Sequence, residues 1–362
     1  MSYSDEARDY LKHNNFDLLR LFAATQVVLG HAATHLEPRL QPYIAWLAYF
    51  PGVPIFFFIS GFLISASWER HPKLRTFAGN RFLRICPALW VAFFLSVAML
   101  AVAYPEAFRL GGFLKVLLWA VAQLTLGQDW NPDFLRGFGV GALNGSLWTI
   151  PVEISFYVAI PILYWLSGRA RSAPLVLGVV VLFSIGAQWG ASLYVGQDSH
   201  TQQLIKFLNI TPVPWIWMFS IGVLAQRFKN VLCPFVAGRF GAFLLLYAAV
   251  SLLAWYMPFY PFLAGDNNRL GILSFLFLAL LVLAAAFSAR NTSDRVLRRN
   301  DISYGVYIYH MPVINLLLAK NFGGVAGIFT ALGATCGVAL LSWFVVEKRA
   351  LRLRVASLHK PG

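Results

Sequence analysis

The sequence predicts an all-α membrane protein. We expect a bundle of about ten transmembrane helices, with one further apolar segment near residues 111–127 that is re-entrant or lies at the membrane surface. Of the 362 residues, 59% are hydrophobic and 12% are charged, whereas roughly a quarter of the residues in a soluble domain are charged. The mean hydropathy is +0.64 over the whole chain. We therefore expect a polytopic membrane protein without a soluble domain.

Apolar runs long enough to span a bilayer, about 20 residues each, recur from one end of the chain to the other. A backbone that spans hydrocarbon must form its own hydrogen bonds, so each run is expected to be a helix. The alternation typical of barrel strands is absent. The predicted segments are 16–35, 50–68, 83–104, 111–127, 147–166, 173–195, 212–228, 240–257, 270–288, 303–319 and 324–345.

The basic residues indicate which segments cross. If 111–127 does not cross, 22 of the 29 Lys and Arg residues fall on the side of the amino terminus. Cytoplasmic loops carry such an excess of Lys and Arg, so we predict ten crossings and two cytoplasmic termini. Lys115 and Gln123 make 111–127 amphipathic enough to lie at the outer surface. The predicted parts are a cytoplasmic segment 1–15, a membrane domain 16–346 and a basic cytoplasmic tail 347–362.

The net charge of +14 is explained by this topology, and we expect no nucleic-acid partner. The three cysteines are far apart and form no CxxC pair, so the sequence indicates neither a disulfide framework nor a zinc site. His31 and His35 in HAATH are spaced for a metal, but no third ligand accompanies them. We therefore expect no metal.

The first span carries two ionisable residues, Arg20 and His31. Eleven residues make about three helical turns, so both side chains lie on one face, about 16 Å apart along the axis. Ionisable residues inside a membrane are rare and usually functional. The alternative is an arginine that reaches the inner headgroups beside a hydrogen-bonded core histidine.

Glu153 lies about two turns from the outer end of its span, near the expected depth of His31. A carboxylate beside a histidine can orient the imidazole and stabilise its cation, as a general base requires. The alternative is a structural ion pair between two helices. His310, nearer the middle of the membrane, is equally consistent with ligand contact and with packing.

Arg81 and Arg84 share a helix face at the inner mouth of the third span. Arg70, Lys73 and Arg75 precede them. Several guanidinium groups held at a helix end suit a polyphosphate. The alternative is an ordinary cytoplasmic loop that attracts anionic lipid.

Six motifs in this order resemble the acyltransferase family 3 membrane proteins, and the resemblance covers nearly the whole chain. They are Arg20 and His31 within NFDLLRLFAATQVVLGH, FFFISGFLIS (Phe56 to Ser65), Arg81 and Arg84 within RFLRICP, Glu153 within SLWTIPVEISFY, His310 within ISYGVYIYH, and VEKRALR (Val346 to Arg352).

The resemblance implies a ten-helix bundle and a cytoplasmic acyl-CoA donor, usually acetyl-CoA. It implies that His31 acts in catalysis and that Arg20, Arg81 and Arg84 bind the donor; we group His310 with these donor-binding residues and Glu153 with His31. The sequence ends right after its last span and lacks the fused extracytoplasmic hydrolase-like domain of longer family members. We therefore expect a stand-alone O-acyltransferase.

The expected reaction moves an acyl group from acyl-CoA to a hydroxyl of a glycan or glycoside at the outer face of the inner (plasma) membrane. A surface polysaccharide, a lipid-linked glycan and a small glycoside fit equally as acceptors. The main alternative is a secondary transporter or a flippase for a lipid-linked sugar, against which no inverted repeat is seen. Trp130, Trp148, Trp215 and Trp217 suit either sugar stacking or an interfacial belt, and we favour the belt.

Overall fold

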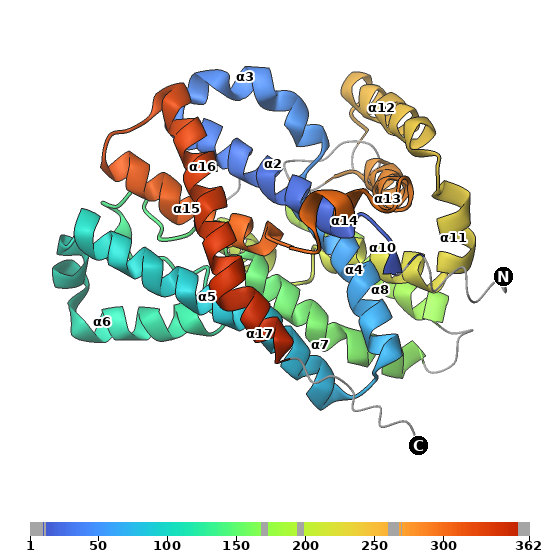
Figure 1. Ribbon diagram of the computed structural model, residues 1–362, viewed down its shortest axis with the longest axis horizontal. Helices are drawn as coiled ribbons and strands as arrows, with labels where there is room; N and C mark the ends of the chain where they lie inside the picture. The colour runs from blue at the N-terminus through green and yellow to red at the C-terminus, as the bar shows by residue number, and fades with distance from the viewer. Residues whose placement is uncertain are drawn as a thin grey trace. The chain divides into compact units, whose positions relative to one another are not determined.

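The computed structural model describes residues 10, 12–167, 173–193, 199–259, 268 and 270–353. All regular structure within these ranges is helical (Figure 1), which confirms the all-α membrane bundle. Most of the predicted segment 1–15 and the last nine residues of the predicted tail lie outside the described residues.

Each predicted apolar segment coincides with a helix. These helices are α2 (Phe16–Leu36), α4 (Gly52–Arg70), α5 (Leu74–Ala103), α6 (Glu106–Leu124), α7 (Thr149–Ser167), α8 (Ala173–Leu193), α10 (Ile216–Arg227), α12 (Phe240–Tyr256), α13 (Ile272–Phe287), α15 (Ser303–Ala319) and α16 (Gly324–Ser342).

Shorter elements lie between these helices or after the last of them. They were not predicted, because they are too short or too polar to stand out as spans. They include α3 (Gln41–Ile44), α9 (Ser199–Asn209), α11 (Lys229–Val236), α14 (Thr292–Leu297), a π-helical turn (Trp343–Glu347) and α17 (Lys348–Arg352).

Six helices in the described part of the chain are long and apolar enough to cross a membrane. The number is seven if α11 and α12, bent by 93°, together form one span. The shorter α13 is also apolar. These lengths confirm a multi-pass protein, and the ten crossings with cytoplasmic termini stay a prediction.

Helix α6 has the length and composition of a span, but its backbone is broken at Gly112, where φ is 66° and ψ is 163°. The straight part after the break, residues 113–124, is about 18 Å long, well short of the roughly 30 Å of hydrocarbon. It packs beside α5 (Figure 1), and Trp90 Nε1 donates a hydrogen bond of 3.0 Å to the Leu124 carbonyl. This geometry agrees with a segment that is re-entrant or lies at the membrane surface, as predicted for 111–127.

The chain forms two compact units, each built from several stretches of sequence, and α2 contributes its first half to one and its second half to the other. Unit 1 comprises Met1–Gln26, Trp46–Arg70 and Val152–Asp301, and unit 2 comprises Val27–Ala45, His71–Pro151 and Ile302–Gly362.

In unit 1, α4 packs closely on α10 because glycines face each other at the contact. A Cβ atom on Gly61 would lie 2.0 Å from the Phe219 carbonyl oxygen, and one on Gly222 would lie 2.2 Å from the Phe58 carbonyl oxygen. Small residues let membrane helices approach to backbone contact. No side chain larger than hydrogen fits there.

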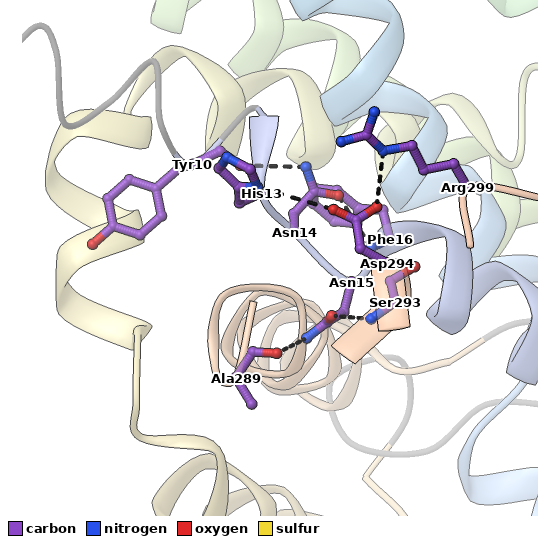
Figure 2. A network of polar contacts seen from close by, with 9 residues as sticks. All are labelled: Tyr10, His13, Asn14, Asn15, Phe16, Ala289, Ser293, Asp294 and Arg299. Carbon is purple, nitrogen blue, oxygen red and sulfur yellow. Dashed lines mark hydrogen bonds and ion pairs between the residues drawn. The ribbon is translucent and has the colours of Figure 1, made fainter. Parts of the chain in front are cut away.

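The start of α2 is fixed in unit 1 by the buried Asn15, which Figure 2 shows next to α14. Its Nδ2 donates to the carbonyl oxygens of Ser288 (2.8 Å), Ala285 (3.1 Å) and Ala289 (3.3 Å). Its Oδ1 accepts the N–H of Ser293 at 2.9 Å. One amide side chain thus satisfies the carboxyl end of α13 and the amino end of α14.

In unit 2, α15 packs against α16 and α5. The second half of α2 joins them through a core that includes Ala32, Leu36, Ile314 and Ala331. A second core fixes α6 and the loop that follows it on α5; it includes Leu100, Trp119, Phe134, Leu135 and Phe138. The segment between α6 and α7 is therefore a packed part of this unit.

We predict that Gly222→Ala destabilises the protein, because the added methyl group overlaps the backbone of α4. Overpacking of this kind costs about 1–3 kcal/mol. The measurement is thermal unfolding in detergent micelles. Gly186→Ala in α8 is the control, since nothing lies within 4 Å of a Cβ built there. Equal melting temperatures for Gly222→Ala and the parent would contradict the close contact.

Candidate active site

The centre of the candidate site is a pair of histidines in unit 2, one from α2 and one from α15. His31 Nδ1 lies 2.8 Å from His310 Nε2, and the two ring planes differ by 24°. His310 is fully buried, at 0% exposure, whereas His31 is partly exposed. The sequence identified both residues but did not predict that they touch.

The second ring nitrogen of His310 is also engaged. His310 Nδ1 lies 2.6 Å from the carbonyl oxygen of Tyr307, one turn earlier in α15. Both ring nitrogens of His310 therefore have partners within the protein. Its role in donor binding stays a prediction.

Pro312 explains an adjacent contact. Proline has no N–H, so it cannot bond the carbonyl of the residue four positions earlier, Ile308. Asn144 Nδ2 donates to that Ile308 oxygen at 2.8 Å and replaces the missing bond. Asn144 Oδ1 in turn accepts the Ser146 hydroxyl at 2.7 Å. The loop before α7 therefore repairs the helix that carries His310.

The same loop supports Tyr307. The Tyr307 hydroxyl donates to the Ser146 carbonyl at 2.8 Å and lies 2.8 Å from Thr149 Oγ1. All three residues are buried. The turn of α15 whose carbonyl holds His310 is thus tied by side-chain bonds to the start of α7.

Asn315, further along α15, fixes another part of the loop before α7. Its Nδ2 donates to the carbonyls of Ala142 (2.8 Å) and Leu143 (3.0 Å), and its Oδ1 accepts the Val140 N–H at 3.0 Å. Gly139 is required beside it, because φ there is 53° and a Cβ would lie 2.1 Å from Asn315 Oδ1. Sequence reasoning missed Asn144 and Asn315. For Asn315 the available signal was an amide three residues after a proline inside an apolar run.

The predicted arginines of α5 lie in the same unit as the histidines. The Arg84 guanidinium carbon is 5.9 Å from the centre of the Tyr304 ring, and that of Arg81 is 5.6 Å from the Phe77 ring. Both arginines are partly buried. The Tyr304 hydroxyl donates to the Ile85 carbonyl at 3.1 Å, which ties the start of α15 to α5. Arginines held over rings keep their charge and their planar donor fork.

Arg20 lies in unit 1 and has a partner that the sequence did not reveal. Its Nη1 is 3.3 Å from Asp301 Oδ2, and both side chains are mostly buried. Among the residues that the structure describes, Arg20 Nε is buried without a hydrogen-bond acceptor. Asp301 therefore fixes the Arg20 guanidinium, while its buried Nε–H has no acceptor among the described residues. The unbroken α2 confirms that Arg20 and His31 share a helix.

Glu153 also lies in unit 1, in the first turns of α7. Its carboxylate accepts a hydrogen bond from the hydroxyl of Tyr157, one turn later in the same helix. Its pairing with His31 stays a prediction.

The predicted outer tryptophans separate into two groups. Trp215 and Trp217 are buried, at 4% and 0% exposure, and Trp217 Nε1 donates to Gln188 at 3.0 Å. These two are core residues of unit 1, so neither an interfacial belt nor sugar stacking applies to them. Trp130 is 45% exposed and Trp148 is partly exposed.

The comparison with protein families decides the assignment. The sequence profile of a family described as an acyltransferase domain, acyltransferase 3, matches residues 13–347. The chain belongs to this family. Family membership favours acyl transfer over the transporter or flippase alternative. The match includes five of the six motifs in full, among them those around His31 and Arg84, and the first two residues of the sixth, Val346 and Glu347.

Individual relatives agree with this assignment. The chain is 34% identical over 360 residues to nodulation protein 10 of Rhizobium leguminosarum bv. viciae. This alignment covers 95% of this chain and 94% of that protein. It is 25% identical to the O-acetyl transferase of Shigella phage Sf6 over 94% of this chain and 96% of that protein. It is 26% identical to the peptidoglycan O-acetyltransferase OatA of Listeria monocytogenes serovar 1/2a, over 74% of this chain and 45% of that protein. No solved structure matches significantly.

We predict that Asn144→Ala destabilises unit 2, because the Ile308 carbonyl then lacks a partner. Leaving a buried polar group unsatisfied costs about 1–3 kcal/mol. Pro312→Ala restores an N–H at the position that can bond this carbonyl, so the double variant should be less destabilised than the two single effects added together. Thermal unfolding of all four proteins measures this coupling. The same cost of Asn144→Ala in both backgrounds would contradict the repair.

Proposed function

We propose that this protein is a membrane O-acetyltransferase that moves an acetyl group from cytoplasmic acetyl-CoA to a carbohydrate hydroxyl at the extracytoplasmic side. The observation that carries the proposal is the partly exposed His31, backed by the buried His310, in a chain of an acyltransferase family. Its relatives from Shigella phage Sf6 and Listeria are named as O-acetyltransferases.

His31 acts as the general base in this proposal. The acceptor oxygen attacks the thioester carbonyl carbon while its proton passes to His31 Nε2. When the carbon–sulfur bond breaks, the CoA sulfur takes that proton, so the products are an acetyl ester and free CoA thiol. A route through an acyl-enzyme requires the same removal and return of a proton. A positioned base of this kind contributes about 10²–10⁴-fold to the rate.

The arginines bind the donor in this proposal. Arg81 and Arg84 hold CoA phosphates at the inner end of α5, where two adjacent guanidinium groups match phosphate oxygens. Arg20, whose guanidinium is fixed by Asp301, binds the donor as well. Glu153 stabilises the imidazolium of His31 by its charge, because Nδ1 of His31 is already occupied by His310.

The acceptor is a carbohydrate: a surface polysaccharide, a lipid-linked glycan or a small glycoside of the cell envelope. The OatA relative, named for peptidoglycan, supports a glycan acceptor. The protein works in the inner (plasma) membrane, where both substrates are reached from opposite sides of one bundle.

We predict that purified protein releases CoA thiol from acetyl-CoA only when an acceptor is present, and that His31→Ala reduces this release about 10²–10⁴-fold. The loss follows from removal of the base. His35→Ala is the matched control, since this histidine lies one turn away on the same helix and has no role in the mechanism. Near-normal turnover in His31→Ala would exclude His31 as the base.

We predict that Arg84→Lys raises the KM for acetyl-CoA although the charge is unchanged, because lysine lacks the planar fork. Arg84→Ala should raise it further, and kcat should change little if the contact is equal in ground and transition states. Donor titrations in nanodiscs at two salt concentrations measure both effects. Arg109→Lys, on the exposed side of α6, is the control. An unchanged donor KM in Arg84→Ala would remove Arg84 from the donor site.

A further inference from the structure

The hydrogen bonds around His310 fix where its proton lies. A carbonyl oxygen can only accept a hydrogen bond, and the Tyr307 oxygen lies 2.6 Å from His310 Nδ1. The proton of that bond must therefore belong to Nδ1 of His310. This contact stays within one turn of α15, so it does not depend on the position of any other helix.

A neutral imidazole has a single N–H. His310 is fully buried among helices, where a charged ring is costly, so its Nε2 carries no proton and can only accept. The group in front of that Nε2 is Nδ1 of His31, at 2.8 Å. The ring centres are 5.1 Å apart and the ring planes differ by 24°, so the two nitrogens lie between the ring centres. The lone pair and the N–H are then nearly in line, as a hydrogen bond requires.

We infer that His310 is a positioning residue that sets the tautomer of His31. It keeps the His31 proton on Nδ1 and leaves Nε2 as the bare nitrogen that receives a proton. Free histidine favours the opposite tautomer, so a histidine at position 31 without this partner would present an N–H where a base is needed. This inference rests on the proposed function for the role of His31, but the tautomer itself follows from the hydrogen bonds alone.

The same arrangement persists through a catalytic cycle. When Nε2 of His31 takes the acceptor proton, Nδ1–H continues to donate to His310, and no ring has to turn. When Nε2 returns the proton to the CoA sulfur, the starting tautomer is restored. The surrounding bonds of Asn144 and Tyr307 hold the turn of α15 from which His310 projects.

The test combines ring ¹⁵N NMR with kinetics on the full-length protein in nanodiscs. The His31 signals are identified by their loss in His31→Gln. We expect them to show a protonated Nδ1 and a bare Nε2 in the parent, and a shift toward protonated Nε2 in His310→Leu. His310→Leu should lower kcat about 10²-fold or more, within the range of a positioned base, with the donor KM unchanged.

Two further variants separate positioning from packing. His310→Gln places an amide oxygen where Nε2 stood, so it should accept the His31 Nδ1–H and recover part of the kcat lost in His310→Leu. Met311→Leu, a buried and volume-conserving change next to His310, should leave both the His31 spectrum and kcat at the parent values.

A protonated Nε2 on His31 in the parent protein would overturn the inference, and so would a parent-like kcat in folded His310→Leu. If His310→Leu does not fold, the parent spectrum and the His310→Gln kinetics still decide whether His310 sets the tautomer of His31. A Nδ1-protonated His31 together with an active His31→Ala enzyme would support the tautomer and reject the proposed catalytic role, so the two failures are distinguishable.

Discussion

A backbone group that loses its helical hydrogen bond inside a membrane has no water to replace it, and this constraint organises unit 2. Pro312 deprives the Ile308 carbonyl of its partner, and Asn144 supplies one from the loop before α7. Because the loop must reach this carbonyl, it follows α15, where Asn315 holds a further part of it. The repaired helix then carries His310 to the side of His31.

The long apolar helices could be predicted from the sequence, because each is encoded by its own apolar run and needs no knowledge of its neighbours. The shared face of Arg20 and His31 was equally accessible, since helical geometry alone fixes it. The bonds of His31 to His310 and of Arg20 to Asp301 could not be predicted. They depend on which helices are neighbours, and no single segment encodes that.

The Asn15 network in unit 1 illustrates the same limit. Its amide satisfies carbonyls of residues near position 288 and the N–H of Ser293, a role that is invisible in the local sequence HNNFD. What the sequence did contain was an oddity: amides and a proline inside or beside runs that were otherwise apolar. Asn144, Asn315 and Pro312 were such oddities. The two asparagines bond backbone groups, and Pro312 leaves a backbone carbonyl without its helical partner.

The partners of α2 have a consequence for how the protein is made. Asn15 bonds a residue 273 positions later, Arg20 one 281 positions later and His31 one 279 positions later. A chain that enters the membrane from its amino terminus therefore inserts α2 and its polar groups early, and the residues that bind these groups late. Until α13 to α15 have been synthesised, the first helix carries amide, guanidinium and imidazole groups without their final partners. The nascent protein must shelter them for most of its translation.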